Sequence, residues 1–248
     1  APNPFAVLGQ THTYGTVAAA RDAVAACGER LAAGGIAEAV RPLVIGVTGY
    51  GRVSRGAQEV VDALDPVAVG PRDLAAVVAD PPDDRRAYKV VFREEDMVAL
   101  KTGEGAGGTA SAAGPGVFDL DDYYRRPERY EGAFARFLPS LTVLVNGIYW
   151  EERYPRLVTK ADARALWAPA ERPRLTVLGD ISCDIGGSVE LTLKETHVGD
   201  PVYVYDPESD DITAGFAGRG PVVLAVGNLP CELARDASEA FSDVLATF

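Results

Sequence analysis

The sequence is poor in the residues that bind metals or form disulfides. Its 248 residues include three cysteines and two histidines. Cys27, Cys183 and Cys231 lie far apart and form no CxxC pair, so neither a disulfide framework nor a structural zinc site is expected. The lack of a disulfide framework is typical of a reducing compartment, and we therefore expect a cytoplasmic protein without a metal site.

Positive charge and long apolar runs are also scarce. The chain carries 24 Lys and Arg residues against 36 Asp and Glu residues, a formal net charge of -12. An acidic surface of this kind repels phosphate backbones and anionic lipids. No apolar run reaches the roughly 18 residues of a membrane-spanning helix. Nucleic acid and membranes are therefore not expected as partners.

The first residue is not methionine. The chain starts Ala1-Pro2-Asn3-Pro4, which resembles neither a signal peptide nor a natural translation start. We therefore expect an excised fragment or a processed product of a longer protein. Hydrophobic residues make up 47% of the chain, which is enough to bury one sizeable core or two small ones.

Helical and strand patterns alternate along the chain. Apolar residues at helical spacing predict a helix over Thr16 to Leu31, and a nearly continuous apolar run over Pro42 to Thr48 predicts a buried strand that a second helix to Leu64 follows. Further strands are expected at 67–69, 88–92, 141–145, 175–178 and 222–226, with a short helix at 74–78. The pattern predicts an α/β fold, a Rossmann-like, doubly wound and mostly parallel sheet of about six strands.

Two segments lack this alternation. Residues 101–116 are rich in Gly, Ala, Ser and Thr without a hydrophobic period, which predicts a mobile loop. Residues 119–136 are crowded with aromatic and charged side chains, which favours an amphipathic helical region that packs its aromatics on the sheet.

The strongest local signal is a glycine turn between the first buried strand and the next helix. It reads Gly49-Tyr50-Gly51-Arg52-Val53-Ser54. Glycines at such a turn let the backbone approach a pyrophosphate, and the helix N-terminus adds unpaired N–H groups and a partial positive charge. The turn therefore predicts a dinucleotide site. The third glycine of a GxGxxG pattern would fall at Ser54, so an ordinary tight turn is the open alternative.

The residues after the second strand bear on which dinucleotide would bind. A NAD site usually has Asp or Glu at this point, where it accepts hydrogen bonds from the ribose hydroxyls. Here the segment reads Val69-Gly70-Pro71-Arg72. With no carboxylate at Gly70 and a guanidinium at Arg72, we expect NADP to be preferred over NAD. Arg72 is alternatively a solvated loop residue.

Three further polar segments follow predicted strands, at the sheet edge where α/β proteins bind ligands. They are Asn146 to Trp150, Gly179 to Glu190, and Gly227 to Pro230. Each is also compatible with an ordinary connection between elements, and for Asp180 and Ser182 local turn and cap bonding is the favoured interpretation.

Together these segments resemble lysine-2-oxoglutarate reductase, the saccharopine-forming half of a bifunctional lysine-degrading enzyme, and more distantly alanine dehydrogenase. The motifs that carry the resemblance occur in the same order and span about Pro4 to Phe248. They are Gly49 to Gln58, Asp121 to Tyr130, Val145 to Glu151 with Pro155 to Thr159, Asp180 to Glu190, and Asn228 to Pro230. Several ordered motifs are more specific than any one alone.

The resemblance implies a two-domain enzyme that reduces the imine of lysine and 2-oxoglutarate with hydride from NADP or NAD. Gly49, Gly51 and Val53 would lie along the pyrophosphate. The nicotinamide end would be lined by Asn146, Gly147, Asn228 and Leu229. Asp184 matches an aspartate beside nicotinamide and substrate, so we expect it to stabilise charge or relay a proton there.

The resemblance also implies that a domain is missing. Residues 1–35 would form an interdomain helix region and residues 36–248 the dinucleotide-binding domain, while the family's catalytic lysine and histidine belong to an N-terminal substrate domain. We therefore expect the chain alone to be inactive. An alanine-dehydrogenase-like half and a non-catalytic cofactor-binding module are the alternatives. An exposed face on Val17, Val24 and Leu31 would favour a homo-oligomer.

Overall fold

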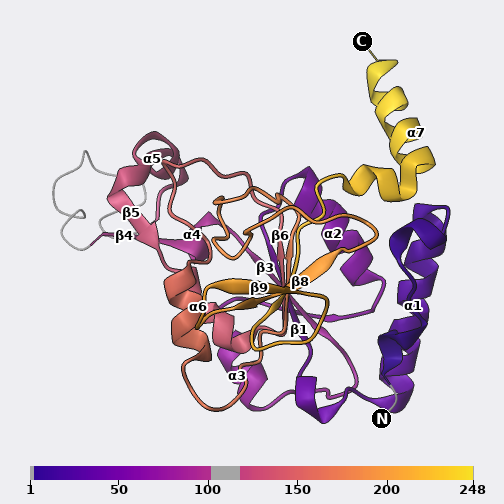
Figure 1. Cartoon of the computed structure of the whole chain (residues 1–248), viewed down its shortest axis with the longest axis horizontal. Coiled ribbons are helices and arrows are strands. Elements are labelled where there is room, and N and C mark those ends of the chain that lie inside the picture. The colour runs from indigo at the N-terminus through magenta and orange to yellow at the C-terminus, as the bar shows by residue number, and fades with distance from the viewer. Residues whose placement is uncertain (1–2, 102–117, 248) are drawn as a thin grey trace.

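The computed structural model describes residues 3–101 and 118–247 and has an eight-stranded sheet at its centre (Figure 1). The strand order is β2-β3-β1-β6-β7-β10-β8-β9. These strands are β1 (Val44–Thr48), β2 (Val67–Val69), β3 (Tyr88–Phe92), β6 (Val143–Asn146), β7 (Val177–Asp180), β8 (Val202–Asp206), β9 (Asp211–Ala214) and β10 (Val222–Leu224). A separate sheet pairs β4 (Val98–Leu100) with β5 (Tyr130–Gly132). Apart from Lys101, the predicted loop at 101–116 lies outside the described residues.

The strands from β2 to β10 in this order are parallel to one another. They overlap the segments predicted from apolar runs, which confirms the predicted α/β, Rossmann-like fold with a mostly parallel sheet. The hairpin of β8 and β9 pairs antiparallel to β10 and was not predicted. It raises the number of strands above the expected six.

β3 lies between β1 and β2 and pairs in parallel with both. Tyr88, Val90 and Phe92 of β3 are fully buried, whereas no residue of the shorter β2 is buried, so β3 takes the central position and β2 the edge. Gly70 and Arg72, which were selected because they follow the second strand, therefore lie at the edge of the sheet and not beside β1.

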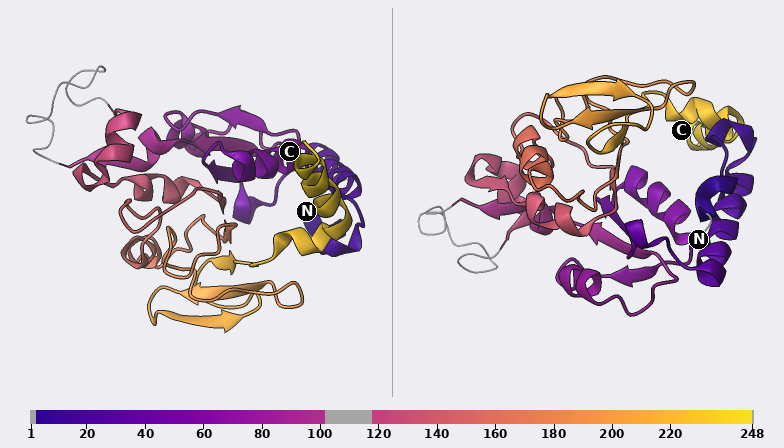
Figure 2. Two further views of the ribbon diagram at one scale, coloured as in Figure 1. Left: turned by 90° about the horizontal axis from the view of Figure 1, so that it is seen from above. Right: turned by 60° about the horizontal axis from the view of Figure 1, so that its bottom comes forward.

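Helices cover both faces of the sheet (Figure 2). The α-helices of the described residues are α1 (Val17–Gly34), α2 (Arg52–Asp62), α3 (Leu74–Ala79), α4 (Glu94–Met97), α5 (Leu120–Arg125), α6 (Lys160–Trp167) and α7 (Ala234–Leu245), of which α7 does not cover the sheet. α1 and α2 pack on one face, where Cys27 and Leu31 contact the core around Val47. α3 and α6 pack on the other face, around Phe92 and Leu144. No helix in the described part of the chain is both long and apolar enough to span a membrane.

α1 turns its apolar side toward its own domain. Leu31 is 1% exposed and Val24 packs against the same core, so of the three residues predicted to form an exposed face only Val17 is exposed. The predicted self-association surface on α1 is therefore wrong. At the start of the helix, the Asp236 carboxylate of α7 accepts a hydrogen bond from Val17 N at 2.6 Å, where negative charge is favoured by the helix dipole.

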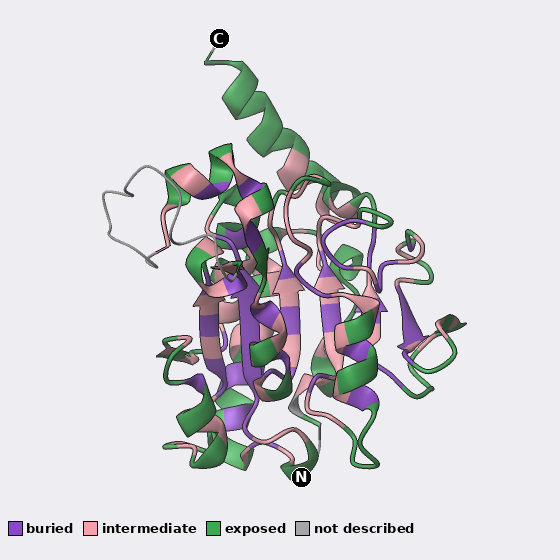
Figure 3. Ribbon diagram, turned by 90° about the vertical axis from the view of Figure 1, so that its left-hand side faces the viewer, coloured by how far each residue is buried: buried purple, intermediate pink, exposed green. Residues whose placement is uncertain are grey.

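α7, in contrast, projects from the body of the molecule (Figure 3). None of its residues is buried, and the side chains of Phe241, Val244 and Leu245 are exposed. The short 3-10 helix before it, Leu229–Leu233, holds it to the N-terminal segment, where His12 N donates to the Glu232 carboxylate at 3.2 Å. The segment around His12 and the residues that lead into α7 therefore lie side by side.

The segment 119–136 is helical only in part. α5 ends at Arg125, and Pro127 then opens a 3-10 turn that leads into β5. Because β5 pairs with β4, the backbone cannot continue as a helix, and the predicted helical region is wrong beyond α5. The predicted packing of its aromatics is confirmed, since Tyr123, Tyr130 and Phe134 are buried in the core.

Candidate functional site

The chain reverses its direction across the sheet between β1 and β6. From β1 it runs to β2 and β3 on one side, and it later returns to β6 on the other side of β1. In open α/β sheets such a reversal leaves a crevice at the carboxyl ends of the two strands, where ligands bind. Gly49 follows β1 and Gly147 follows β6, so two predicted site segments meet at this crevice.

The glycine turn has the conformation that its residues suggest. Gly49 has a φ of 81°, in the left-handed region that favours glycine. Gly51 is the N-cap of α2 without a side-chain cap, and a Cβ there would meet no atom within 4 Å. Arg52 and Val53, in the first turn of α2, are exposed. The helix N-terminus is therefore uncapped by side chains and open to approach, which fits a pyrophosphate.

Ser54 stands in the place of the third glycine and is fully buried. Its hydroxyl donates to the carbonyl oxygen of Gly49 at 2.5 Å and so closes the turn. The third glycine normally permits close packing of helix against strand. Gly147 lies against this part of the turn, since a Cβ on Gly147 would lie 3.4 Å from both Ser54 N and Val53 Cγ1.

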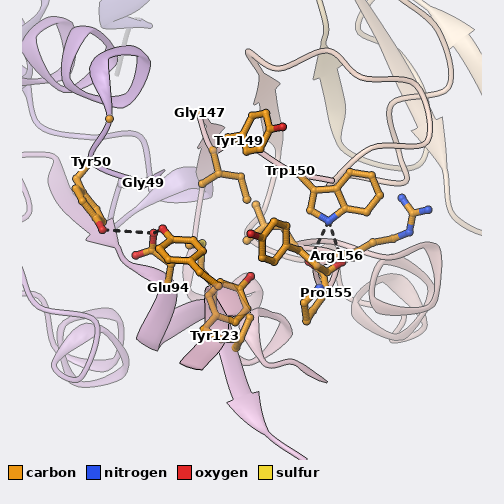
Figure 4. Close-up of a pocket in the computed structure, with 16 residues that line it drawn as sticks. Gly49, Tyr50, Glu94, Tyr123, Gly147, Tyr149, Trp150, Pro155 and Arg156 are labelled. Carbon is orange, nitrogen blue, oxygen red and sulfur yellow. Dashed lines mark hydrogen bonds between the residues drawn. The ribbon is translucent and has the colours of Figure 1, made fainter. Parts of the chain in front are cut away.

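A cavity of about 260 Å³ opens beside the turn (Figure 4). Its walls come from the glycine turn, the segment after β6 and several aromatic side chains. They include Gly49, Tyr50, Gly51, Glu94, Tyr123, Tyr124, Gly147, Tyr149, Trp150, Tyr154 and Arg156. Sites for whole ligands usually measure about 300–1,000 Å³. The cavity is therefore of a size to take one part of a dinucleotide, with the remainder along the sheet edge.

Glu94 and two tyrosines form one wall of this cavity. The Tyr124 hydroxyl donates to Glu94 Oε1 at 2.8 Å, and the Tyr50 hydroxyl donates to the same oxygen at 3.4 Å. Burial first, and the Glu94 carboxylate second, raise the pKa of both tyrosines. Both hydroxyls therefore stay protonated at neutral pH and serve as donors to the carboxylate.

A buried polar network joins the strand ends below the crevice. Asn146 Nδ2 donates to Asp180 Oδ1 at 2.8 Å and to Ser188 Oγ at 2.9 Å. The Thr48 hydroxyl donates to Asn146 Oδ1 at 2.9 Å, and the Thr192 hydroxyl donates to Asp180 Oδ2 at 2.5 Å. All five residues are at most 1% exposed. Asn146 therefore lies beneath the crevice and holds β1, β6 and β7 together, with its side-chain amide already bonded.

The predicted catalytic residue Asp184 lies on an exposed loop after β7. The Arg156 guanidinium donates to the carbonyl oxygens of Gly186 and Gly187 and pairs with Glu190 Oε1 at 3.2 Å. These contacts hold the later part of the loop, at residues 186–190. The buried network holds its start, at Asp180. Asp184 is thereby presented to solvent at the carboxyl edge of the sheet, and it does not line the cavity.

The remaining predicted residues lie further away. Gly70 and Arg72 follow the edge strand β2 and line a separate hollow of about 1140 Å³ to which no residue of the glycine turn contributes. Asn228 is exposed at the start of the 3-10 helix after β10, and Leu229 is half-buried. Neither lines the cavity. The structure thus brings together Gly49, Tyr50, Gly51 and Gly147, and leaves the other predicted residues outside this cavity.

Several cavity residues were not predicted as site residues. Glu94, Tyr124 and Arg156 are polar residues that line the cavity at the glycine turn and that were not predicted from the sequence. The acidic turn after the strand at 88–92 was visible in the sequence. Its place beside the glycine turn depends on the strand order, which the sequence pattern does not show.

Curated proteins resemble the chain over nearly its whole length. It is 33% identical over 255 residues to the mitochondrial alpha-aminoadipic semialdehyde synthase of Bos taurus, a match that covers 98% of this chain and 26% of that protein. It is 33% identical over 258 residues to the alpha-aminoadipic semialdehyde synthase of Arabidopsis thaliana, covering 99% and 23%. The chain thus spans about a quarter of the length of these relatives. The resemblance to the lysine-2-oxoglutarate reductase proteins predicted from the motifs is confirmed.

Solved structures and family models add little to this relationship. An L-alanine dehydrogenase aligns with a TM-score of 0.40 and 15% sequence identity, over 94% of this chain and 51% of that chain. No family model matches the chain.

Proposed function

We propose that this chain is the nicotinamide-dinucleotide-binding part of an oxidoreductase. The observation that carries the proposal is the uncapped N-terminus of α2 behind Gly49 and Gly51, placed at the reversal point of a parallel sheet and open to a cavity. Rossmann folds bind a pyrophosphate at such a place. The homology to alpha-aminoadipic semialdehyde synthases over 98% of the chain supports the proposal.

The residues of the chain would bind and orient the cofactor. Gly49 and Gly51 would let the pyrophosphate approach, and the N–H groups of Arg52 and Val53 would face it. Tyr50 would stand over the same turn, beside the cavity. The bound nicotinamide would supply the hydride, which no side chain of a protein can provide.

The nicotinamide end would extend over β6 and β7 toward β10. Gly147 and the loop with Asp184 stand on that side of the glycine turn, and Asn228 and Leu229 follow β10 further along the sheet. Asn146 would act from below, by holding the ends of β1, β6 and β7 in register. An exposed carboxylate at Asp184 would stabilise positive charge, or relay a proton, at the reacting centre.

The reaction that we propose is the reductive condensation of lysine with 2-oxoglutarate to saccharopine. Such a reaction needs an acid or base within hydrogen-bond reach of the imine and a pocket that orients both substrates. The chain spans about a quarter of its relatives, and we propose that these groups come from the remainder. Residues 1–248 would then bind the cofactor without turnover.

Two measurements test the proposal. Calorimetric titration of the folded chain with NAD and NADP should show saturable binding of at least one of them, and an assay with lysine, 2-oxoglutarate and NAD(P)H should show no saccharopine. Failure to bind either dinucleotide would contradict the cofactor site. Robust turnover by the chain alone would contradict the dependence on a further domain.

The role of Asp184 needs a protein that turns over. In a longer protein that adds the proposed substrate domain, Asp184→Asn should lower kcat by roughly a hundredfold while the dissociation constant of the cofactor changes little. Equal effects on both quantities, or none on kcat, would make Asp184 a structural residue.

Two finer points concern location and cofactor preference. A cytoplasmic location is our proposal from the sequence, which has few cysteines and no CxxC pair, and cell fractionation tests it. A preference for NADP over NAD remains our proposal from the lack of a carboxylate at Gly70 and the guanidinium of Arg72, and the titration with both dinucleotides tests it.

A further inference from the structure

We infer that Asp180 is a positioning residue of the proposed cofactor site, which acts through Asn146 on the place of Gly147. The inference rests on the proposed dinucleotide site and goes beyond it, by naming a buried residue outside the cavity that determines the affinity for the dinucleotide. Local turn bonding, the interpretation favoured from the sequence, accounts for the contact of Asp180 with Ser182 but not for its contact with Asn146, which crosses to the next strand.

The last residues of three neighbouring strands stand in one row. Thr48 ends β1, Asn146 ends β6 and Asp180 ends β7. In the register of the parallel sheet, Thr48 pairs with Asn146, and Asn146 pairs with Asp180. Residues in register on adjacent strands direct their side chains to the same face of the sheet, so these three can bond one after another. All three are at most 1% exposed.

The carboxylate at one end of this row fixes the direction of each hydrogen bond. An ionised carboxylate has only acceptors, so the Asn146 atom that faces Asp180 at 2.8 Å is the donor Nδ2. The other atom of that amide, Oδ1, accepts from the Thr48 hydroxyl at 2.9 Å. The Thr48 oxygen in turn accepts from Gly147 N at 3.3 Å. Three hydrogen bonds of defined direction thus connect Asp180 to the backbone of Gly147.

The same pair of side chains also holds the loop that carries Asp184. Before Asp184, the Ser182 hydroxyl donates to Asp180 Oδ1 at 2.7 Å. After it, Ser188 Oγ accepts from Asn146 Nδ2 at 2.9 Å. Asp180 and Asn146 therefore set the place of this loop and the place of Gly147 together.

The place of Gly147 matters because this residue lines the cavity and lies against the N-terminus of α2 (Figure 4). A Cβ on Gly147 would lie 3.4 Å from Ser54 N, in the first turn of that helix. Binding groups must be held within about 0.5 Å of their productive places, and a site that must reorganise loses affinity. A displaced Gly147 would disturb the helix end at which the pyrophosphate is proposed to bind.

The first test compares two variants with the same chemical change. Thr48→Val removes the hydroxyl between Asn146 and Gly147. Thr192→Val removes the hydroxyl that donates to the other oxygen of Asp180, Oδ2. Both threonines are fully buried and valine has their shape, so each variant should lose stability. Calorimetry with NAD and with NADP should show binding at least about tenfold weaker in Thr48→Val, and changed by less than about twofold in Thr192→Val.

The second test replaces Asp180 itself. Asp180→Leu removes the acceptor that faces Asn146 and should weaken dinucleotide binding by about tenfold or more. Asp180→Asn keeps an oxygen that can accept from Asn146, while its amide can donate to the Thr192 hydroxyl. Asp180→Asn should therefore bind within about threefold of the unaltered chain. A role of Asp180 through its charge would make the two variants equally weak.

The outcomes separate this inference from the cofactor site. Equal affinities of folded Thr48→Val and Thr192→Val would make Asp180 a merely structural residue and overturn the inference. Equal weakening in Asp180→Leu and Asp180→Asn would overturn it too, because charge and not position would then matter. If Asp180→Leu does not fold, the two threonine variants decide. These results leave the dinucleotide site in place, whereas an unaltered chain that binds neither dinucleotide would contradict the proposed function and the inference with it.

Discussion

The N–H of Gly49 donates a hydrogen bond to the carbonyl oxygen of Phe92 at 2.9 Å. This bond fixes the turn after β1 to the end of β3, and the Ser54 hydroxyl fixes it from the other side by donating to Gly49 O. A turn held in this way is ordered before a ligand arrives, so little conformational freedom is lost on binding. Substitutions at the turn should therefore act on ligand affinity through charge and space.

Gly51→Asp should weaken dinucleotide binding by about a hundredfold or more. Its Cβ has room, so the fold should persist, but the carboxylate would lie where the pyrophosphate approaches and repel it. Gly56→Asp is the matched control, because Gly56 is also exposed with open space around its Cβ but lies one turn into α2. It should change the dissociation constant by less than about threefold. Equal binding by both variants would place the site elsewhere.

Thr192→Val should lower the free energy of unfolding by about 1–3 kcal/mol. Valine has the shape of threonine, so the change removes only the hydroxyl that donates to Asp180 Oδ2 and leaves a buried carboxylate oxygen without that partner. Thr213→Val makes the same change on the exposed side of β9 and should cost less than about 0.5 kcal/mol. Urea denaturation measures both. If Thr192→Val and Thr213→Val lowered the free energy of unfolding equally, the buried hydrogen bond would add no stability beyond that of an exposed hydroxyl.

Asp210 should give the protein a stability that depends on pH. The hydrogen bond from Lys160, and next that from Tyr205, hold the pKa of Asp210 below its ordinary value. Since the folded pKa is the lower one, the stabilisation is present above the unfolded pKa of about 3.9 and is lost as pH falls through the folded value. Asparagine tolerates the φ of 60° at this position.

Asp210→Asn should therefore lower the free energy of unfolding by up to about 1 kcal/mol at neutral pH, a modest effect because the pair is partly exposed. The difference from the unaltered protein should shrink when the pH is brought below about 3. Thermal unfolding at both pH values measures it. A difference that stays constant with pH would contradict the assigned electrostatic origin.

Arg156→Lys should loosen the loop that carries Asp184. Lysine keeps the charge but lacks the planar set of N–H groups that reach two loop carbonyls, so hydrogen exchange over residues 181–190 should become faster. The fluorescence of Trp150 should also change, because the guanidinium lies 4.7 Å from the centre of its ring. Arg153→Lys is the control, since Arg153 stacks on Tyr154 instead. Unchanged exchange in Arg156→Lys would contradict its role.

The sequence predicted those elements whose signal is local. The apolar runs that became β1 and β3 show their length and position directly, and Gly49 marks a turn because left-handed backbone favours glycine. An equally apolar run at Val202–Asp206 was left out of the expected sheet, although it is a strand in the structure. That omission accounts for the missing hairpin.

The strand order could not be predicted in the same way. Whether β2 or β3 lies next to β1 depends on which strand buries more side chains on both faces once the helices have packed, and this is a property of the whole domain. The strand order also matters for the site. Gly70 and Arg72 were selected by their distance from the glycines along the chain, while the residue that the structure bonds to Tyr50 of the glycine turn is Glu94, after β3.

The order of the strands also constrains how the domain assembles. β2 has one neighbour in the sheet, β3, and that neighbour comes later in the chain. While the chain is being synthesised, residues 67–69 therefore have no partner strand until residues 88–92 have emerged, and until then β1 lacks a neighbour on either side, since β6 comes later still. Unpaired strands are where nascent chains associate with one another. Residues 44–69 are consequently open to misassembly until β3 has been made.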